Sequence, residues 1–410
     1  MGLVVHKFGG SSVADTDLIK TAAKRAIDTK KGGDKGGDNV IVVVSAMGNE
    51  TDKLYDLAKQ IMENPPSREV DMLVSTGEQV SIALMSMAIQ SFGQDAISFL
   101  GGQIGVRTDG YHEKAKILGI DKEKVEAAFA EGKIVVVAGF QGTDKQMNIT
   151  TLGRGGSDTS AVALAAVFGA DVCVINKDVD GVCTADPRIV PNASLLKTIS
   201  YDEMLELAGM GAGVLHSRAV ELAKKHNVPL RVRSSFNEKP GTLVCLEDPN
   251  QEQPMARGAT FNKQEARVTI SEVPDKPGMA ATILKHIAER NINVDMIIQN
   301  PGRSGLADLT FTVPKSDLHE TLEVCKEVST QIGAKDVTSS EDIAKLSVIG
   351  SGMRAHSGVA SRMFTALAKE NVNIQNISTS EIKISCIVAE KDCDRSLRAV
   401  HEAFELDKVE

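Results

Sequence analysis

Short apolar runs alternate with longer amphipathic stretches through residues 1–245. Helical spacing is predicted in between, over Asp15–Lys30, Glu69–Gln90 and Thr159–Phe168. Because continuous apolar strands separated by helices are typical of a parallel sheet, this part is predicted to be an α/β fold, a largely parallel sheet covered by helices on both faces. The runs that predict buried strands are Leu3–Phe8, Val40–Val44, Ile134–Ala138 and Asp171–Ile175.

A polar segment with two prolines, residues 247–254, interrupts this pattern. After it, the chain repeats itself at an offset of 80 residues, and apolar positions between the identities mostly keep their character. Each copy has a strand-like run before its helix and another after it, which predicts a tandem β-α-β-β module of ferredoxin-like type. The identical pairs are Gly278/Gly358, Ala280/Ala360, Ala288/Ala368, Asn291/Asn371, Asn293/Asn373 and Ile297/Ile377.

These patterns predict four parts along the chain. Their boundaries are 1–246 for the sheet domain, 247–264 for a linker, 265–342 for the first repeat unit and 343–410 for the second. The length of 410 residues agrees with two or three domains.

Composition excludes several classes of function. Lys and Arg number 46 against 55 Asp and Glu, so the formal net charge is −9, opposite to that of most proteins that neutralise nucleic-acid phosphates. Aromatic residues are 3% of the chain, too few for a base-stacking platform. Six cysteines without a CxxC pair predict reduced thiols in a cytoplasmic protein. Neither a signal peptide nor a membrane span of about 18 apolar residues is expected.

Two glycine-containing segments have the chemistry of anion sites. Residues 7–12 (KFGGSS) follow the first strand, and residues 150–160 (TTLGRGGSDTS) precede an apolar helix. Glycines let backbone N–H groups approach an anion, a helix N-terminus favours negative charge, and an arginine grips a carboxylate or phosphate with two hydrogen bonds. The first segment is not a Walker A loop and is also compatible with an ordinary strand–helix turn. Helix capping alone does not account for the three glycines and Arg154 of the second segment.

Three further segments are candidates. Residues 177–188 (KDVDGVCTADPR) follow the fourth strand, where ligands of parallel sheets bind, and their spacing does not fit an EF-hand. Residues 45–49 follow the second strand, and Glu78 lies near the start of a long helix. For Glu78 the favourable position of an acid near a helix start is an equally good explanation.

Together, these segments make the chain similar to the aspartate kinases of the amino-acid-kinase superfamily. Residues 7–13, 151–158 and 178–188 match the three signatures of that family in order, and the 80-residue repeat matches its two C-terminal ACT units. The Lys-x-Gly-Gly element alone is shared with acetylglutamate, glutamate and uridylate kinases. The arginine–glycine segment and the tandem ACT units narrow the resemblance to the aspartate kinases. The resemblance covers the whole chain.

The resemblance implies transfer of the ATP γ-phosphoryl group to the side-chain carboxylate of L-aspartate. It implies that ATP enters with Mg²⁺, that the protein itself supplies no metal ligands, and that no other cofactor is bound tightly. The implied catalytic residues are Lys7, Arg154 and Asp158. The implied nucleotide site comprises Lys7, Gly9, Gly10, Ser11, Ser45, Lys177, Asp178, Cys183, Asp186 and Arg188. The implied aspartate site comprises Glu78, Arg154, Gly155, Ser157 and Asp158, with Arg154 on the α-carboxylate.

The ACT units imply feedback control by lysine, threonine or both, and a homo-oligomer formed through these units, without nucleic-acid or membrane partners. A purely structural role of the ACT units in the oligomer is the alternative. The implied effector residues of the first copy are Asp275, Lys276, Gly278, Met279, Ala280, Asn293, Val294, Asp295 and Gln299. Those of the second copy are Ser357, Gly358, Val359, Asn373, Ile374, Ser380 and Glu381.

The chain departs from the family pattern at Gly213, where a phosphate-contacting lysine is usual. Lys177 and Arg218 are the candidates to replace its charge. Two alternatives therefore remain open: another amino-acid or carbamate kinase of the same fold, and an amino-acid-sensing subunit or pseudo-kinase that binds effectors without phosphoryl transfer.

Overall fold

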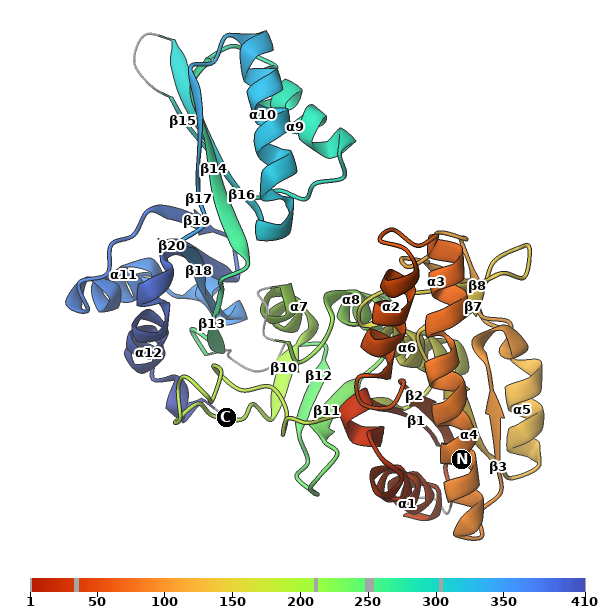
Figure 1. Ribbon diagram of the computed structural model, residues 1–410. Coiled ribbons are helices and arrows are strands. Elements are labelled where there is room, and N and C mark those ends of the chain that lie inside the picture. Colours follow the sequence, from red (N-terminus) through yellow and green to blue (C-terminus); the bar gives the residue numbers. More distant parts are fainter. Residues whose placement is uncertain (1, 33–36, 210–212, 248–253, 302–304, 410) are drawn as a thin grey trace. The chain divides into compact units, whose positions relative to one another are not determined.

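The computed structural model describes residues 2–32, 37–209, 213–247, 254–301 and 305–409 (Figure 1). The chain forms two compact units. The first unit comprises Met1–Cys183 and Ser194–Gln251, and the second comprises Thr184–Ala193 and Glu252–Val409.

The first unit is built on an eight-stranded sheet whose central strands are the predicted apolar runs. Its pairings are parallel except that of β11 with β12, which confirms the predicted fold class. The order across the sheet is β10 (Thr198–Ser200), β12 (Thr242–Cys245), β11 (Leu230–Ser234), β9 (Val172–Lys177), β1 (Leu3–Phe8), β2 (Asn39–Val44), β6 (Ile134–Ala138) and β3 (Ala96–Phe99).

Helices cover this sheet on both faces. On one face, α1 (Thr16–Gly32) and α4 (Thr76–Ser91) bury alternate residues of β2 and β6, together with Phe8 of β1, in a common core. On the other face, α6 (Gly156–Phe168) packs on β1 and β9 and contacts α8 (Ser217–His226). The remaining helices of the unit are α2 (Glu50–Ile61), α3 (Ser67–Val74), α5 (Glu123–Ala130) and α7 (Tyr201–Gly209).

The helix expected over 69–90 is two helices, α3 and α4, separated at Ser75. The Ser75 hydroxyl donates to the carbonyl of Met72, and the Ser75 carbonyl accepts from Gln141 Nε2 at 3.0 Å. Residues Ser67–Ser91 together are long and apolar enough to cross a membrane, contrary to the expected absence of such a run, but 56% of the apolar stretch is buried within the protein. This burial is typical of a core helix.

A small second sheet in the first unit presents loops toward α3. Its strands, in order, are β5 (Ile117–Gly119), β4 (Arg107–Thr108), β7 (Gln141–Thr143) and β8 (Ile149–Thr151). Strand β8 leads directly into the arginine–glycine segment and α6.

The second unit contains two four-stranded antiparallel sheets with helices, one for each sequence repeat. The helix that follows the first strand begins after Gly278 in one repeat and after Gly358 in the other, with φ of 95° and 84°. The first repeat consists of β14 (Glu265–Pro274), α9 (Met279–Glu289), β15 (Asp295–Pro301), β16 (Leu306–Pro314), α10 (Leu318–Ile332) and β17 (Asp336–Ser340). The second consists of β18 (Ile343–Ile349), α11 (Val359–Lys369), β19 (Asn376–Thr379), β20 (Lys383–Ala389) and α12 (Cys393–Ala403).

The fourth strand of the second repeat comes from before the first repeat. Strand β13 (Gly258–Asn262), inside the expected linker 247–264, pairs antiparallel with β18. The segment Thr184–Ala193 also belongs to this unit, since Ala185 and Val190 are buried in the core of the second repeat. The unit therefore draws on two segments that precede it in the sequence.

Candidate functional site

The carboxyl ends of four neighbouring strands define the candidate site. Phe8 of β1 pairs with Val44 of β2 and Asn176 of β9, and Val44 pairs with Ala138 of β6. The residues that follow these positions therefore emerge together at one edge of the sheet, where open α/β sheets bind ligands. They include Ser45, whose side chain is half-buried and whose N–H donates to the carbonyl of Phe8.

A buried charge cluster lies at this edge. Lys7 Nζ is 2.7 Å from Asp158 Oδ1, and Lys177 Nζ is 3.3 Å from Asp158 Oδ2. Burial opposes ionisation of Asp158, but the two ammonium groups hold the pKa of its carboxyl below the ordinary value. The Lys7 and Asp158 side chains are 8% and 3% exposed, so the paired charges are largely removed from water. The site thus presents two cations arranged around one carboxylate.

Gly10 permits a close approach of two chain segments. A Cβ at Gly10 would lie 2.6 Å from the carbonyl oxygen of Gly48, whose N–H donates to the Gly10 carbonyl. A Cβ at Gly9 would lie 3.4 Å from Lys7 Nζ, so Gly9 allows the ammonium group to lie close to the backbone of this turn. Ser11 is exposed beside them.

The N-terminus of α6 reaches the same edge. Gly155 caps the helix with a φ of 69°, and a Cβ there would lie 2.4 Å from the His216 side chain. Ser157, in the first turn, stands where a Cβ on Gly139 would meet it at 2.7 Å. The arginine–glycine segment therefore needs Gly155 for packing.

Glu78 has an unusual environment. It lies on α4, is 2% exposed, and accepts one hydrogen bond through Oε1 from the Ala46 N–H at 3.2 Å. Its Oε2 atom is buried without a hydrogen-bond partner among the described residues. Burial raises the pKa of Glu78 to about 8. A carboxyl group in this state is suited to receive a cationic ligand.

Arg154 is exposed, and no hydrogen bond or ion pair ties its side chain to the described part of the chain. Arg218, in contrast, donates to the carbonyls of Leu152 and Ala115 at 2.8 and 2.6 Å. Of the two cations expected to replace the missing lysine at Gly213, only Lys177 belongs to the charge cluster. Gly213 is exposed and has a φ of 67°.

The segment 177–188 is divided between the two units. Asp178 is exposed and Cys183 half-buried in the first unit, whereas Asp186 and Arg188 belong to the second. Asp186 and Arg188 form an ion pair at 2.7 Å, and the Arg188 side chain is 88% exposed.

Sequence reasoning missed a polar centre beneath the charge cluster. Asn176 is fully buried, and its Nδ2 donates to the carbonyl of Lys7 at 3.1 Å. Arg25 of α1 donates to Asn176 Oδ1 at 3.2 Å and to the carbonyl of Ser234 at 2.7 Å. The available signal was a single amide in an otherwise apolar run, VCVIN.

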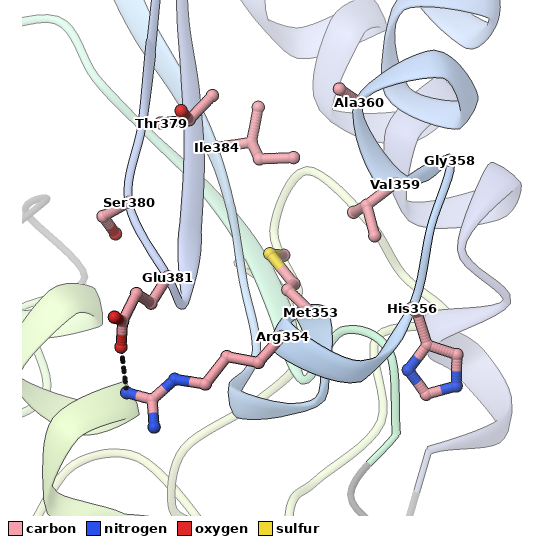
Figure 2. A pocket seen from close by; sticks show the side chains of 10 residues that line it. All are labelled: Met353, Arg354, His356, Gly358, Val359, Ala360, Thr379, Ser380, Glu381 and Ile384. Atoms are coloured by element: carbon pink, nitrogen blue, oxygen red, sulfur yellow. Dashed lines mark ion pairs between the residues drawn. The ribbon is translucent and has the colours of Figure 1, made fainter.

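A pocket of about 700 Å³ lies in the second repeat (Figure 2). Arg354 and Glu381 form an ion pair of 2.9 Å, and Figure 2 shows Met353, Val359 and Ile384 facing a common space beside it. Four expected effector residues line the pocket. Four others, which the sequence did not predict, are Met353, Arg354, Thr379 and Ile384. Met353 and Arg354 reach the pocket because a turn at 351–355 places them there. The expected members of the lining are Gly358, Val359, Ser380 and Glu381.

The other expected effector residues lie outside this lining. Asp295, expected to meet an ammonium group, forms an ion pair with Lys345 of the second repeat, a buried lysine that also pairs with Glu265. The remaining residues of the first repeat lie on loops (Asp275, Lys276, Gly278, Asn293 and Val294), at the start of α9 (Met279 and Ala280) and within β15 (Gln299). Those of the second repeat, Ser357, Asn373 and Ile374, lie on loops.

No group of three or more His, Cys, Asp or Glu side chains that would hold a metal ion occurs within the described ranges. The six cysteines are free thiols.

Family models match a kinase region followed by two ACT regions, and the kinase match includes the segment 184–193 that belongs to the second unit. The amino acid kinase family matches residues 2–234, and ACT domains match residues 267–329 and 346–404. An aspartokinase of Pseudomonas aeruginosa is 53% identical over 409 residues, covering 99% of this chain and 98% of the relative. An aspartate kinase of Stutzerimonas stutzeri is 52% identical over 408 residues with the same coverage.

The chain belongs to the aspartate kinase family. Escherichia coli aspartokinase III, solved in complex with aspartate and ADP in its R-state, has a TM-score of 0.79 and 25% identity, covering 98% of this chain and 99% of that one. The expected fold, family and class of enzyme are thereby confirmed.

Proposed function

We propose that this aspartate kinase family member transfers the γ-phosphoryl group of ATP to the side-chain carboxylate of L-aspartate, giving 4-phospho-L-aspartate. The observation that carries the proposal is the Lys7–Asp158–Lys177 cluster at the carboxyl edge of the sheet, next to the α6 N-terminus. The substrate carboxylate has an ordinary pKa of about 3.9 and is ionised at pH 7, so the reaction needs no general base. The barrier to the reaction is the electrostatic repulsion between the two anions, the carboxylate and the phosphate, as they approach each other.

The cluster supplies what that barrier requires. Lys7 and Lys177 neutralise phosphate charge, and the backbone N–H groups of Gly10 and Ser11 cradle the phosphates, while the Gly9 N–H donates to the Asn176 carbonyl. Ser45 lies near the transferred group, and Asp178 and Cys183 complete the part of the nucleotide site that belongs to the first unit. Mg²⁺ enters with ATP as part of that substrate.

Aspartate is recognised by groups of opposite charge at its α-carbon. Arg154 is exposed and fits the α-carboxylate with two parallel hydrogen bonds. Glu78 Oε2, buried and unpaired in the described structure, fits the α-ammonium group. Gly155, Ser157 and Asp158 form the remaining wall at the α6 N-terminus.

We further propose that the second ACT unit binds an amino-acid effector, lysine or threonine, in the pocket of Figure 2. Arg354 and Glu381 match the carboxylate and ammonium groups of a free amino acid, and apolar side chains accept its stem. An effector inhibits if it binds the less active state more tightly. The pathway role is the first step toward lysine, threonine and methionine in the cytoplasm.

Edge strands of the ACT sheets support a homo-oligomer. Ile297 on β15 and Ile377 on β19 occupy the same repeat position and are 50% and 45% exposed. Both strands lie at the edge of their sheet. An exposed edge with an apolar side chain is suited to pair with a second copy of the chain.

The test is turnover of Mg·ATP with L-aspartate, with the acyl phosphate trapped by hydroxylamine, in the absence and presence of lysine, threonine and both. Hydroxamate that decreases on adding effector supports a feedback-regulated enzyme. Absence of hydroxamate together with a thermal shift by lysine or threonine favours the sensing subunit, for which Gly213 is the specific observation. Gly213→Lys is then the next variant, and recovery of turnover would identify the missing cation as the cause.

A further inference from the structure

Asp71 is a buried carboxylate that the proposed reaction leaves without a role. It lies on α3 and is fully buried. It accepts from the Thr151 N–H at 3.0 Å and hydroxyl at 2.5 Å, and from the Glu113 N–H at 3.1 and 3.2 Å. His112 Nδ1 lies 2.7 Å from Asp71 Oδ2. One carboxylate therefore ties together two separate chain segments.

Both segments support the loop that carries Arg154. Thr151 is the last residue of β8 and directly precedes residues 152–155. The Glu113 carbonyl lies 2.7 Å from the place a Cβ on Gly153 would occupy, and the Ala115 N–H donates to the Thr151 carbonyl at 2.9 Å. The segment 112–115 thus packs against the arginine–glycine loop and supports it.

The other end of the tie is the helix pair that carries Glu78. Asp71 is seven residues before Glu78, and only Ser75 separates α3 from α4. Gln141 Nε2 adds a second link, to the Ser75 carbonyl. The position of Arg154's loop relative to Glu78 is therefore fixed through the Asp71 carboxylate.

We propose that Asp71 is a positioning residue for L-aspartate: by binding Thr151 and Glu113 it holds the Arg154 loop at the spacing from Glu78 that matches the two charges on the α-carbon. The inference rests on the proposed aspartate site. Its physical basis is that a recognition group displaced by about 1 Å loses much of its binding contribution. A buried carboxylate bonded to several N–H donors is rigid, because each donor left unpaired would carry a desolvation cost.

The test compares Asp71→Asn with wild type in the hydroxamate assay. The amide keeps the volume but turns an NH₂ group toward N–H donors. We expect KM for L-aspartate to rise about tenfold while KM for ATP stays within about twofold. Thr151→Val, which removes one donor, should produce a smaller rise in the same constant, and Thr151→Ser, which retains the hydroxyl, should behave as wild type.

Glu203→Gln is the matched control. Glu203 is 1% exposed, and its Oε2 accepts from the Ser200 N–H and hydroxyl at the start of α7. The Glu203→Gln substitution should lower the thermal midpoint of unfolding without changing KM for L-aspartate. If Asp71→Asn and Thr151→Val lower stability and leave KM for aspartate unchanged, the proposal is wrong. If Asp71→Asn does not fold, the Thr151 pair decides. Wild type that makes no hydroxamate from L-aspartate contradicts the proposed function instead, so the two failures are distinct.

Discussion

At the scale of single residues, Glu78 combines burial, a raised pKa of about 8 and a carboxyl oxygen that has no hydrogen-bond partner in the described part of the chain. In the ligand-free protein at pH 7 it is therefore mostly protonated. A cation placed beside it favours the carboxylate, so binding of the aspartate ammonium group must release a proton.

We expect the affinity for L-aspartate to rise with pH between about 6 and 8, and calorimetry in buffers of different ionisation enthalpy to detect the released proton. Glu78→Gln should bind aspartate more weakly and lose this pH dependence. An affinity that is flat across this range in wild type would contradict a role of Glu78 in binding the ammonium group.

His6, next to Lys7 in β1, provides a second titration. Burial, then the charges of Arg25 and Arg233, lower its pKa to about 3. His6 takes up a proton near pH 6.5 in the unfolded chain but only near pH 3 in the folded chain. The folded state is therefore not penalised above pH 6.5, and it loses stability relative to the unfolded state as pH falls from 6.5 toward 3.

The free energy of unfolding of the first unit, measured with denaturant, should therefore fall by about 1.4 kcal/mol for each pH unit below about 6 because of this histidine. His6→Gln should reduce that slope between pH 6 and 4.5. His226→Gln is the control, because His226 is exposed at the end of α8 in the same unit and its substitution should leave the slope unchanged.

At the scale of elements, the site depends on how closely α6 approaches β6. Gly139, just after β6, leaves room for Ser157 in the first turn of α6. Gly139→Ala places a methyl group 2.7 Å from Ser157 Cβ, and the helix must shift. Overpacking of this kind costs about 1–3 kcal/mol.

We expect Gly139→Ala to lower both the thermal midpoint and turnover, because the α6 N-terminus carries Ser157 and Asp158. Gly209→Ala is the control, since a Cβ on Gly209 meets no atom of the described residues within 4 Å. Equal turnover in both variants would show that the placement of α6 tolerates this shift.

The repeat identities also have an explanation at this scale. Gly278 and Gly358 cap equivalent helices in the left-handed region, and Asn291 and Asn371 follow those helices with φ of 57° and 52°. Glycine and asparagine adopt this conformation at least cost. Two of the six repeated pairs are therefore residues whose backbone conformation restricts the choice of side chain.

At the scale of the whole molecule, part of the kinase sequence belongs to the ACT unit. The Ala259 N–H donates to the Thr184 carbonyl at 2.8 Å, Thr184 Oγ1 lies 2.9 Å from the buried His401, and Arg398 donates to the Ile189 carbonyl. Val190, 2% exposed, lies in the core of the second repeat. This segment follows directly after the strand and loop that carry Lys177 and Asp178.

Val190→Asp should therefore destabilise the second unit by several kcal/mol, because it buries an unpaired charge. Val179→Asp, at a residue that is 37% exposed on the loop after β9, is the control and should be close to neutral. Thermal unfolding with and without lysine or threonine measures the effect. An unchanged midpoint for Val190→Asp would show that segment 184–193 contributes little to the second unit.

The sequence by itself determined the parallel sheet, the helices α1 and α6, and the tandem modules, because apolar periodicity and backbone-restricted glycines act over a few residues. The family resemblance of the sequence also predicts Lys7, Glu78, Arg154 and Asp158 as site residues. Only the tertiary structure decided that Lys177 rather than Arg218 joins the charge cluster, that β13 completes the second ACT sheet, and that Asp71 and Arg354 face their partners. Those outcomes depend on contacts between distant segments, and no local pattern in the chain encodes which distant group will satisfy a buried charge.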